Sequence, residues 1–312
     1  MPPAGLFSFQ AQKMTQSGIF LIDKPIGPSS AQVVHRVKVV SGAKKIGHLG
    51  TLDPFASGLL LIGVNEGTKV ADIFIGAAKS YRGVMVLGVA TDSQDATGNV
   101  VAVRPVPPID DAVLKELERK FTGEQQQIPP MFSALKKDGV RLYKLARQGK
   151  EIPREPRSIT IETLRLDRVG EAEVEIDVTC TRGTYVRTLA ADMGEALGCG
   201  AHLKSLRRTA CGHLLLENAV TLDELERRSA LNEMPLLSLS AALCHLRSVT
   251  WQMGQLARLR SGQQEILDVL ERPRAGEQLM RILDTRGELA ALAHWSDEIP
   301  GGRWRLLRVF CA

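Results

Sequence analysis

The sequence lacks the signatures of several common protein classes. No apolar run approaches the roughly 18 residues that a membrane-spanning helix needs, and the richest run, residues 59–64, has the length of a strand. The first 17 residues show no charged region followed by an apolar stretch, so they give no sign of a secretory signal. No G-x-G-x-x-G or G-x-x-x-x-G-K-S/T pattern stands at a predicted strand end, and no nucleotide cofactor is predicted. We therefore expect a cytoplasmic protein without membrane attachment.

Cysteine is scarce, with five in the chain and no C-x-x-C pair, which is typical of a reduced, cytosolic protein. Cys199, His202, Cys211 and His213 are residue types that bind zinc, and they fall within a short window. Their spacing, C-x-x-H and then C-x-H, fits no established zinc pattern. We therefore predict no metal and no other cofactor, and keep a zinc-dependent base-modifying enzyme as an alternative.

Positive charge is concentrated in one segment. The 312 residues include 40 Lys or Arg and 35 Asp or Glu, for a net charge of +5. Residues 136–157 alone hold eight basic and three acidic side chains, so the rest of the chain is neutral. A solvated helix face would explain this pattern. A basic insertion, at about residues 125–157, that clamps an RNA backbone would explain it too, and we favour the insertion.

Hydrophobic patterning predicts an α+β fold, because strands and helices follow one another without a regular βαβ rhythm. We expect strands at residues 18–22, 59–64 and 171–179, helices at about 29–40 and 185–197, and a loop at 125–130. Alternating apolar and acidic residues at 173–178 indicate an antiparallel sheet with one wet face. The predicted organisation is a disordered tail (1–17), a main domain (18–245) and a small C-terminal domain (250–312).

The glycine-rich stretch at residues 47–58, G-H-L-G-T-L-D-P-F-A-S-G, is the first that can carry chemistry. Pro54 favours an extended conformation at Asp53 and so presents its carboxylate from a stiff loop ahead of a buried strand. A carboxylate in that place can act as a nucleophile or base. A turn aspartate that bonds only to nearby backbone amides remains the alternative.

Three further stretches combine aromatic, basic and apolar residues. Tyr81 lies between Lys79 and Arg82 and can stack on a nucleobase, although a half-buried strand tyrosine would look the same. Tyr185 and Arg187 lie at a predicted strand-to-helix junction, where Arg187 can pair with a carboxylate or simply face solvent. The last stretch, residues 198–209, contains Leu206, Arg207 and Arg208, which suit either a pocket wall with phosphate contacts or plain core.

Together these strings resemble the TruB family of tRNA pseudouridine synthases. The resemblance rests on D-K-P-I-G-P-S-S at residues 23–30, G-H-L-G-T-L-D-P at 47–54, K-S-Y-R at 79–82, G-T-Y-V-R at 183–187 and L-R-R at 206–208. It covers roughly residues 18–215. It implies a pseudouridine synthase fold with a central mixed, mainly antiparallel sheet, and a PUA-like, RNA-binding C-terminal β domain at 250–312.

The resemblance also implies a role for each site residue. Asp53 is the catalytic nucleophile, Arg187 pairs with it, and Tyr81 stacks on the flipped uracil and is suited to removing the C5 proton. His48 contacts the RNA beside the displaced nucleotide. The pocket and phosphate contacts that it implies are Tyr185 and Leu206 for the uridine pocket, and Lys136, Lys137, Arg141, Lys144, Arg207 and Arg208 for the RNA backbone.

The implied substrate is uridine 55 in the T-loop of tRNA, bound through the T-arm and elbow by a monomer that needs no protein partner. A protein with the same fold that binds and folds tRNA, with catalysis secondary, is the main alternative. A member of the guide-RNA-dependent branch of the family is another, although the short chain without long basic tails argues against it.

Overall fold

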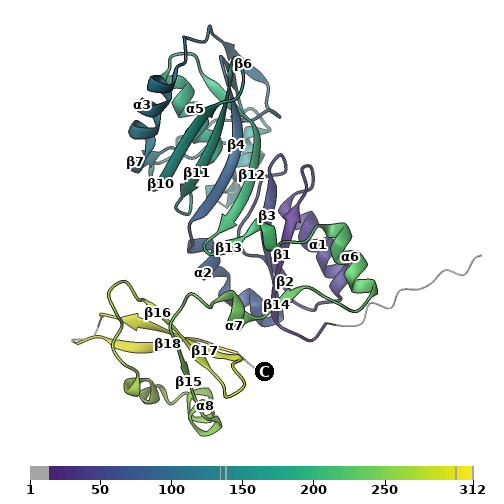
Figure 1. The fold of residues 1–312 in the computed structure, drawn as a ribbon, viewed down its shortest axis with the longest axis vertical. Coiled ribbons are helices and arrows are strands. Elements are labelled where there is room, and N and C mark those ends of the chain that lie inside the picture. The colour runs from purple at the N-terminus through teal and green to yellow at the C-terminus, as the bar shows by residue number, and fades with distance from the viewer. Residues whose placement is uncertain (1–13, 134, 138, 299–300, 311–312) are drawn as a thin grey trace, which may run out of the picture.

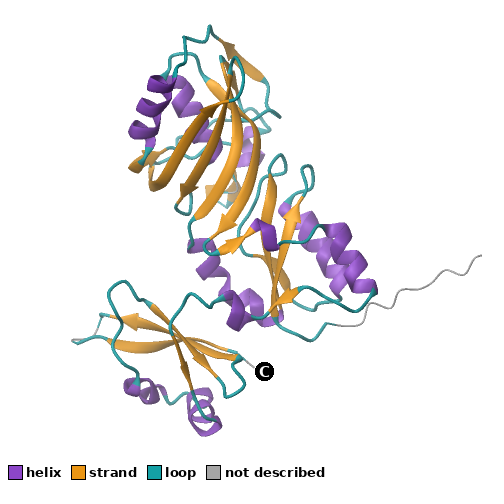
Figure 2. Ribbon diagram, in the orientation of Figure 1, coloured by secondary structure: helices purple, strands orange, loops and turns teal. Residues whose placement is uncertain are grey.

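The structure is a computed structural model that describes residues 14–133, 135–137, 139–298 and 301–310 (Figure 1). A large sheet with helices packed against it forms the main body, and a smaller sheet forms a C-terminal lobe (Figure 2). Within the described ranges, no helix is long and apolar enough to cross a membrane.

The strands and helices follow one another along the chain, with short 3-10 helices marked η. In order they are β1 (Gly18–Lys24), α1 (Ser30–Ser41), β2 (Ile46–His48), β3 (Ser57–Val64), η1 (Asn65–Val70), α2 (Ala71–Gly76), β4 (Lys79–Leu87), β5 (Val89–Thr91), β6 (Val100–Val103), α3 (Asp111–Phe121), β7 (Gly123–Gln127), β8 (Lys136–Lys137), β9 (Val140–Arg141), α4 (Leu142–Ala146), β10 (Arg157–Arg168), β11 (Glu173–Cys180), α5 (Val186–Ala196), β12 (Ala201–Cys211), β13 (Leu214–Leu215), η2 (Leu216–Asn218), α6 (Leu222–Ala230), β14 (Leu236–Leu237), α7 (Leu239–Ala242), β15 (Ser248–Thr250), α8 (Met253–Arg260), η3 (Gln264–Val269), β16 (Leu279–Leu283), β17 (Leu289–Ser296) and β18 (Arg303–Val309).

The main sheet has the strand order β14-β1-β3-β12-β4-β11-β10-β7, with β2 paired to β3 and β13 paired to β12. Its strand pairs are antiparallel except β12 and β3, which run parallel at Arg207–Ser57 and Arg208–Gly58. The predicted α+β class and the mixed, mainly antiparallel sheet are therefore confirmed. The single parallel junction brings the loop before β3 beside the end of β12.

Strand β3 shows why the main body has two cores. Its residues alternate between the two faces of the sheet, and every residue from Gly58 to Val64 is buried. Leu60 and Ile62 pack with α1 and α6 on one face, whereas Leu59 and Leu61 pack with α2 and α7 on the other. A continuous apolar run without polar alternation is the pattern of a strand covered on both faces. The predicted buried strand at 59–64 is therefore confirmed.

The C-terminal lobe is built on the sheet β15-β16-β17-β18, and its core includes Trp251 and Trp304. The rings of Trp295 and Trp304 meet edge to face with centroids 5.5 Å apart. Leu292 and Phe310 face away from this core and are buried with α2 and β3 of the main body. The lobe is therefore joined to the main body by apolar packing as well as by the chain.

Two expectations about local structure were wrong. Residues 125–127, expected to begin a loop at 125–130, belong instead to strand β7, which pairs with β10 from Gly123–Ile161 to Gln127–Arg157. Residues 14–17, expected in the disordered tail, are held in place, since the side-chain amide of Asn65 donates to the carbonyls of residues 14–16. The rest of that predicted tail, residues 1–13, lies outside the described residues.

Candidate active site

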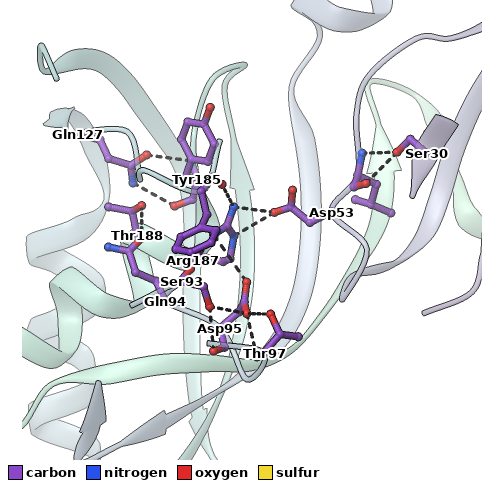
Figure 3. Close-up of polar contacts among 12 residues, drawn as sticks. Ser30, Asp53, Ser93, Gln94, Asp95, Thr97, Gln127, Tyr185, Arg187 and Thr188 are labelled. Atoms are coloured by element: carbon purple, nitrogen blue, oxygen red, sulfur yellow. Dashed lines mark hydrogen bonds and ion pairs between the residues drawn. The ribbon is translucent and has the colours of Figure 1, made fainter. Parts of the chain in front are cut away.

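The loop that carries Asp53 is fixed from several directions by polar contacts. Ser30 Oγ accepts from the amide of Leu52 at 2.9 Å and donates to its carbonyl at 2.8 Å (Figure 3). The amide of Gly27 donates to the carbonyl of Pro54, and that of Ala56 to the carbonyl of Asp53. These bonds explain why the 23–30 and 47–58 stretches occur together: the first holds the second.

Lys24 is a fully buried cation beneath this loop, and sequence reasoning gave it no role. Its ammonium donates to the carbonyls of Ala56 at 2.7 Å, Pro25 at 2.8 Å and Pro54 at 3.4 Å. Burial lowers the pKa of Lys24 to about 8, against the attraction of the Asp53 carboxylate. Its position inside the D-K-P string was the only available signal.

Arg187 is the hub of the site. Its Nε and one terminal nitrogen each lie 3.0 Å from a carboxylate oxygen of Asp53 (Figure 3). The remaining donors reach the carbonyls of Ser93 at 2.7 Å and Phe132 at 2.8 Å. Arg187 is 3 % exposed, whereas the side chain of Asp53 is 41 % exposed. The pair therefore presents an accessible carboxylate on a buried, fully engaged guanidinium.

A second carboxylate, Asp95, lies 3.7 Å from Arg187 and was missed by sequence reasoning. It is buried, and it accepts from the hydroxyls of Ser93 at 2.8 Å and Thr97 at 2.6 Å and from the amide of Thr97 at 2.9 Å. Its loop has the composition of an ordinary turn, so only the folded structure reveals its contact with the hub.

Tyr185 is positioned through its backbone. Its amide donates to the side-chain oxygen of Gln127 at 2.8 Å, and the Gln127 amide group donates back to the Tyr185 carbonyl at 3.2 Å (Figure 3). Gln127 is buried at the end of β7, so the unexpected strand orients a pocket residue. Burial raises the pKa of the Tyr185 phenol.

A single pocket of about 650 Å³ gathers the predicted chemistry. Asp53, Tyr81, Tyr185, Arg187 and Leu206 all line it, although they come from widely separated parts of the chain. Burial raises the pKa of Tyr81, which therefore stays protonated at neutral pH.

Glycine at position 83 lets β4 and β12 approach closely at this pocket. A Cβ atom at Gly83 would lie 2.5 Å from the carbonyl oxygen of Ser205 and 3.3 Å from the Leu206 side chain. Gly83 pairs with Leu206 across the two strands. The glycine that directly follows the K-S-Y-R string is therefore required by the close packing of the two strands.

His48 lies near the pocket but does not line it. It ends β2, is half-buried, and its Nδ1 has no hydrogen-bond partner within the described part of the chain. Burial, together with the positive charge of Arg208, lowers the pKa of His48. The imidazole is therefore neutral at physiological pH, and its predicted RNA contact stays a prediction.

Arg208 has a structural role at the site. It is 3 % exposed, and its guanidinium donates to the carbonyls of Leu59 at 2.6 Å and Thr51 at 3.2 Å. These bonds support the Asp53 loop, and its predicted phosphate contact stays a prediction. Arg207 is 43 % exposed and pairs with Asp23 at 2.7 Å, so its phosphate contact stays a prediction.

The basic insertion forms the short β8–β9 hairpin and α4. Lys136, Lys137, Arg141 and Lys144 are all exposed. Phe132, whose carbonyl accepts from Arg187, lies just before this hairpin. Leu135 and Arg157 line the Asp53 pocket, so the insertion meets the active site on both sides of the hairpin and α4, whose cations face solvent.

The four possible zinc ligands occupy separate environments. The thiols of Cys199 and Cys211 contact the carbonyls of Gly194 and Phe74, respectively. His202 Nδ1 bonds to the carbonyl of Val89, and the His213 ring packs against His245. Among the described residues, no three His, Cys, Asp or Glu side chains form a group that could hold a metal ion. The alternative of a zinc centre at this cluster finds no support.

Two family models match the chain. One is described as the N-terminal domain of the TruB family pseudouridylate synthases and matches residues 38–186. The other is described as the tRNA pseudouridylate synthase B C-terminal domain and matches residues 187–246. The two matches meet between Val186 and Arg187, inside the pocket, so the site is made from both.

Known proteins resemble the chain over most of its length. "tRNA pseudouridine synthase B" of Geobacter sulfurreducens is 42 % identical over 305 residues, which cover 94 % of this chain and 99 % of the relative. The Geotalea uraniireducens protein of the same name is 47 % identical over 78 % of this chain and 80 % of its own length.

Among solved structures, the chain shares its fold with one titled "Crystal Structure of a Cbf5-Nop10-Gar1 Complex". The TM-score is 0.70 at 23 % identity, and the match covers 97 % of this chain and 92 % of the other. The predicted pseudouridine synthase fold is therefore confirmed, and the chain belongs to the TruB family of pseudouridine synthases, which are isomerases.

Proposed function

We propose that this protein converts uridine to pseudouridine at position 55 in the T-loop of tRNA, with Asp53 as the nucleophile. The observation that carries the proposal is the accessible Asp53 carboxylate, held by a buried Arg187 inside a pocket that also contains Tyr81 and Tyr185. Relatives at 42 % and 47 % identity carry the name tRNA pseudouridine synthase B, which supports the choice of substrate.

The reaction is an isomerisation, so its atoms balance within one nucleotide. The bond from ribose C1′ to N1 of uracil breaks, a bond from C1′ to C5 forms, C5 loses a proton and N1 gains one. No electrons and no external group are transferred, and for that reason the chemistry calls for no cofactor. A uridine inside the folded T-loop must first be flipped out of its stack to reach the pocket.

Each pocket residue then has a defined task. Asp53 attacks either uracil C6 or ribose C1′, while Arg187 orients its carboxylate and offsets its charge. Tyr81 stacks on the base, and Tyr185 and Leu206 form the surrounding walls. Because the buried Tyr81 phenol is protonated in the free protein, it must pass that proton on before it accepts one from C5.

The rest of the protein positions the RNA in this proposal. The exposed cations of the β8–β9 hairpin and α4 contact phosphates of the T-arm, and His48 lies beside the vacated position in the loop. The C-terminal lobe acts as a PUA-like RNA-binding domain. Opening the tRNA elbow to flip the base gives the protein a tRNA-folding activity alongside catalysis, and that activity would need the cations but not Asp53.

One assay tests the function. The protein is incubated with tRNA carrying tritium at uracil C5, and released tritium is followed over time. We expect release from the T-loop uridine with wild-type protein and none with Asp53→Asn, while tRNA binding is retained. Asp177→Asn is the matched control, since it breaks an exposed ion pair with Arg82 outside the pocket. Wild-type turnover by Asp53→Asn would refute the nucleophile.

A further inference from the structure

Five basic side chains and one carboxylate, Asp53, line the pocket. The basic ones are Lys79, Arg157, Arg182, Arg187 and Arg208. Because the cations outnumber the single carboxylate, the pocket and its mouth favour an anionic ligand. Which of these cations are free to bind such a ligand depends on how far the protein already uses their donors.

Three of the five cations are engaged by the protein itself. Lys79 donates to three carbonyls at the end of α2, at 2.6–2.9 Å. Arg187 is shared between Asp53 and two carbonyls, and Arg208 is bound to the carbonyls around the Asp53 loop. All three are buried, so they serve the architecture of the site and do not reach out to a ligand.

The other two, Arg157 and Arg182, differ in both respects. Both are exposed, and neither guanidinium has a hydrogen-bond or ion-pair partner among the residues that the structure describes. Arg157 is the first residue of β10, and Arg182 lies in the turn between β11 and α5. Two unpaired guanidinium groups therefore stand at the pocket on different segments of the chain.

The two segments are tied to each other. The amide of Thr181 donates to the carbonyl of Thr160 at 3.0 Å, and the amide of Thr160 donates to the Thr181 hydroxyl at 2.9 Å. Both arginines line the same pocket. They therefore stand at one site, on a backbone whose local geometry is fixed by these hydrogen bonds.

We propose that Arg157 and Arg182 bind the two phosphate groups that flank the uridine in the pocket. The proposal rests on the proposed function, because a flipped nucleotide carries its 5′ and 3′ phosphates to the mouth of the pocket that takes its base. A guanidinium offers a planar fork that matches two phosphate oxygens. Neither arginine belongs to the β8–β9 hairpin or α4, so this site is separate from the predicted phosphate contacts of those elements.

Neutral phosphate linkages provide the test. A hairpin RNA with the T-arm sequence is made in three forms: unmodified, with a methylphosphonate 5′ of the target uridine, and with one 3′ of it. Conversion and affinity are measured for wild type, Arg157→Ala, Arg182→Ala and the two Lys variants. Arg165→Ala is the matched control, because Arg165 is exposed on β10 and pairs with Asp167 outside the pocket.

We expect each Ala variant to lose about tenfold or more in kcat/KM on the unmodified hairpin, the size of a hydrogen bond to a charged group. One methylphosphonate should reduce the kcat/KM of wild type by a similar factor. It should reduce the kcat/KM of the matching Ala variant little, because the arginine that would contact that phosphate is already absent. The Lys variants should recover part of the loss, and Arg165→Ala should behave as wild type.

Additive losses in every combination would overturn the proposal, because they would show that neither arginine meets a flanking phosphate. The same comparison in affinity decides the matter even if conversion is absent. Failure of wild type to convert the unmodified hairpin and full tRNA would instead contradict the proposed function. The two failures are therefore distinguishable.

Discussion

Arg187 donates a 2.8 Å hydrogen bond to the backbone carbonyl of Phe132, and the same guanidinium holds the Asp53 carboxylate. Phe132 lies just before the basic hairpin, so one buried cation connects the base of the predicted RNA-binding insertion with the predicted nucleophile. A shift of the insertion on RNA binding would reach Asp53 through this single group.

The first prediction concerns the geometry of that cation. Arg187→Lys keeps the charge but cannot serve the Asp53 carboxylate and the carbonyls of Ser93 and Phe132 together, because an ammonium lacks the planar fork. We expect kcat to fall by about 100-fold, the usual effect of losing one preorganised electrostatic contact, with tRNA affinity little changed. Single-turnover tritium release and filter binding measure the two quantities.

The matched control for this prediction is Arg82→Lys, which alters an exposed pair with Asp177 on the wet face of the sheet. It should leave both quantities near wild type. Wild-type kcat in Arg187→Lys would show that charge alone suffices at this position and that the fork has no catalytic importance.

The second prediction concerns Lys24 and pH. Its pKa is lowered to about 8 in the folded protein from 10.5 when solvated, so the folded state binds fewer protons than the unfolded state between these values. Stability contributed by this group therefore rises as the pH increases from about 8 toward 10.5. Lys24→Met lacks this contribution. The Tm of wild type minus the Tm of Lys24→Met should therefore increase from pH 8 to pH 9.5.

Lys38→Met serves as the control for removing a lysine side chain, since Lys38 is exposed on α1. Lys24→Met should also lower kcat, because the carbonyls of Pro54 and Ala56 lose their donor beside Asp53. If the Tm of wild type minus that of Lys24→Met instead decreases with rising pH, the ammonium charge stabilises the loop and the desolvation argument is wrong.

Much of the fold was predictable because short stretches of sequence show the hydrophobic pattern of the strand or helix that they form. The alternation of Val174, Ile176 and Val178 predicts β11, and the continuous apolar run predicts the doubly covered β3. Strand β12 gave no such signal, since its register shifts between Leu203 and Ser205 break the period of two. Strand β7 is a run of glutamines whose strand character comes from its partner β10.

The residues of the pocket also divide into those that the sequence predicted and those that only the structure shows. Asp53, Tyr81 and Arg187 lie in contiguous strings that resemble a family, and the fold brings them to one pocket. Their catalytic roles stay predictions. The roles of Lys24 and Asp95 come from their contacts with the Asp53 loop and with Arg187. Those contacts join distant parts of the chain, so no local sequence pattern predicts them. The burial of Arg208 was missed for the same reason, because the sequence of a strand end does not show which arginine is buried.

The third prediction separates two roles of Tyr81. Tyr81→Phe keeps the aromatic face but removes the phenol oxygen, so stacking should persist and tRNA affinity should stay near wild type. We expect kcat to fall by about 100-fold if the oxygen takes the C5 proton, within the usual range for general base catalysis. Tyr81→Leu should lose more, since it lacks the ring as well. Equal kcat in wild type and Tyr81→Phe would assign the proton to another acceptor.

The final prediction concerns the basic insertion. Neutralising Lys136, Lys137, Arg141 and Lys144 to Gln should make the plot of log affinity for tRNA against log salt shallower by up to about 3, as each phosphate contact contributes roughly 0.7–0.9 to the slope. The matched control replaces four other exposed cations, Lys115, Arg119, Lys120 and Arg165, which lie on α3 and β10. Equal slopes in both quadruple variants would mean that net charge, and not the hairpin, sets the salt dependence. An unchanged slope in the first variant would favour a solvated basic face without RNA contact.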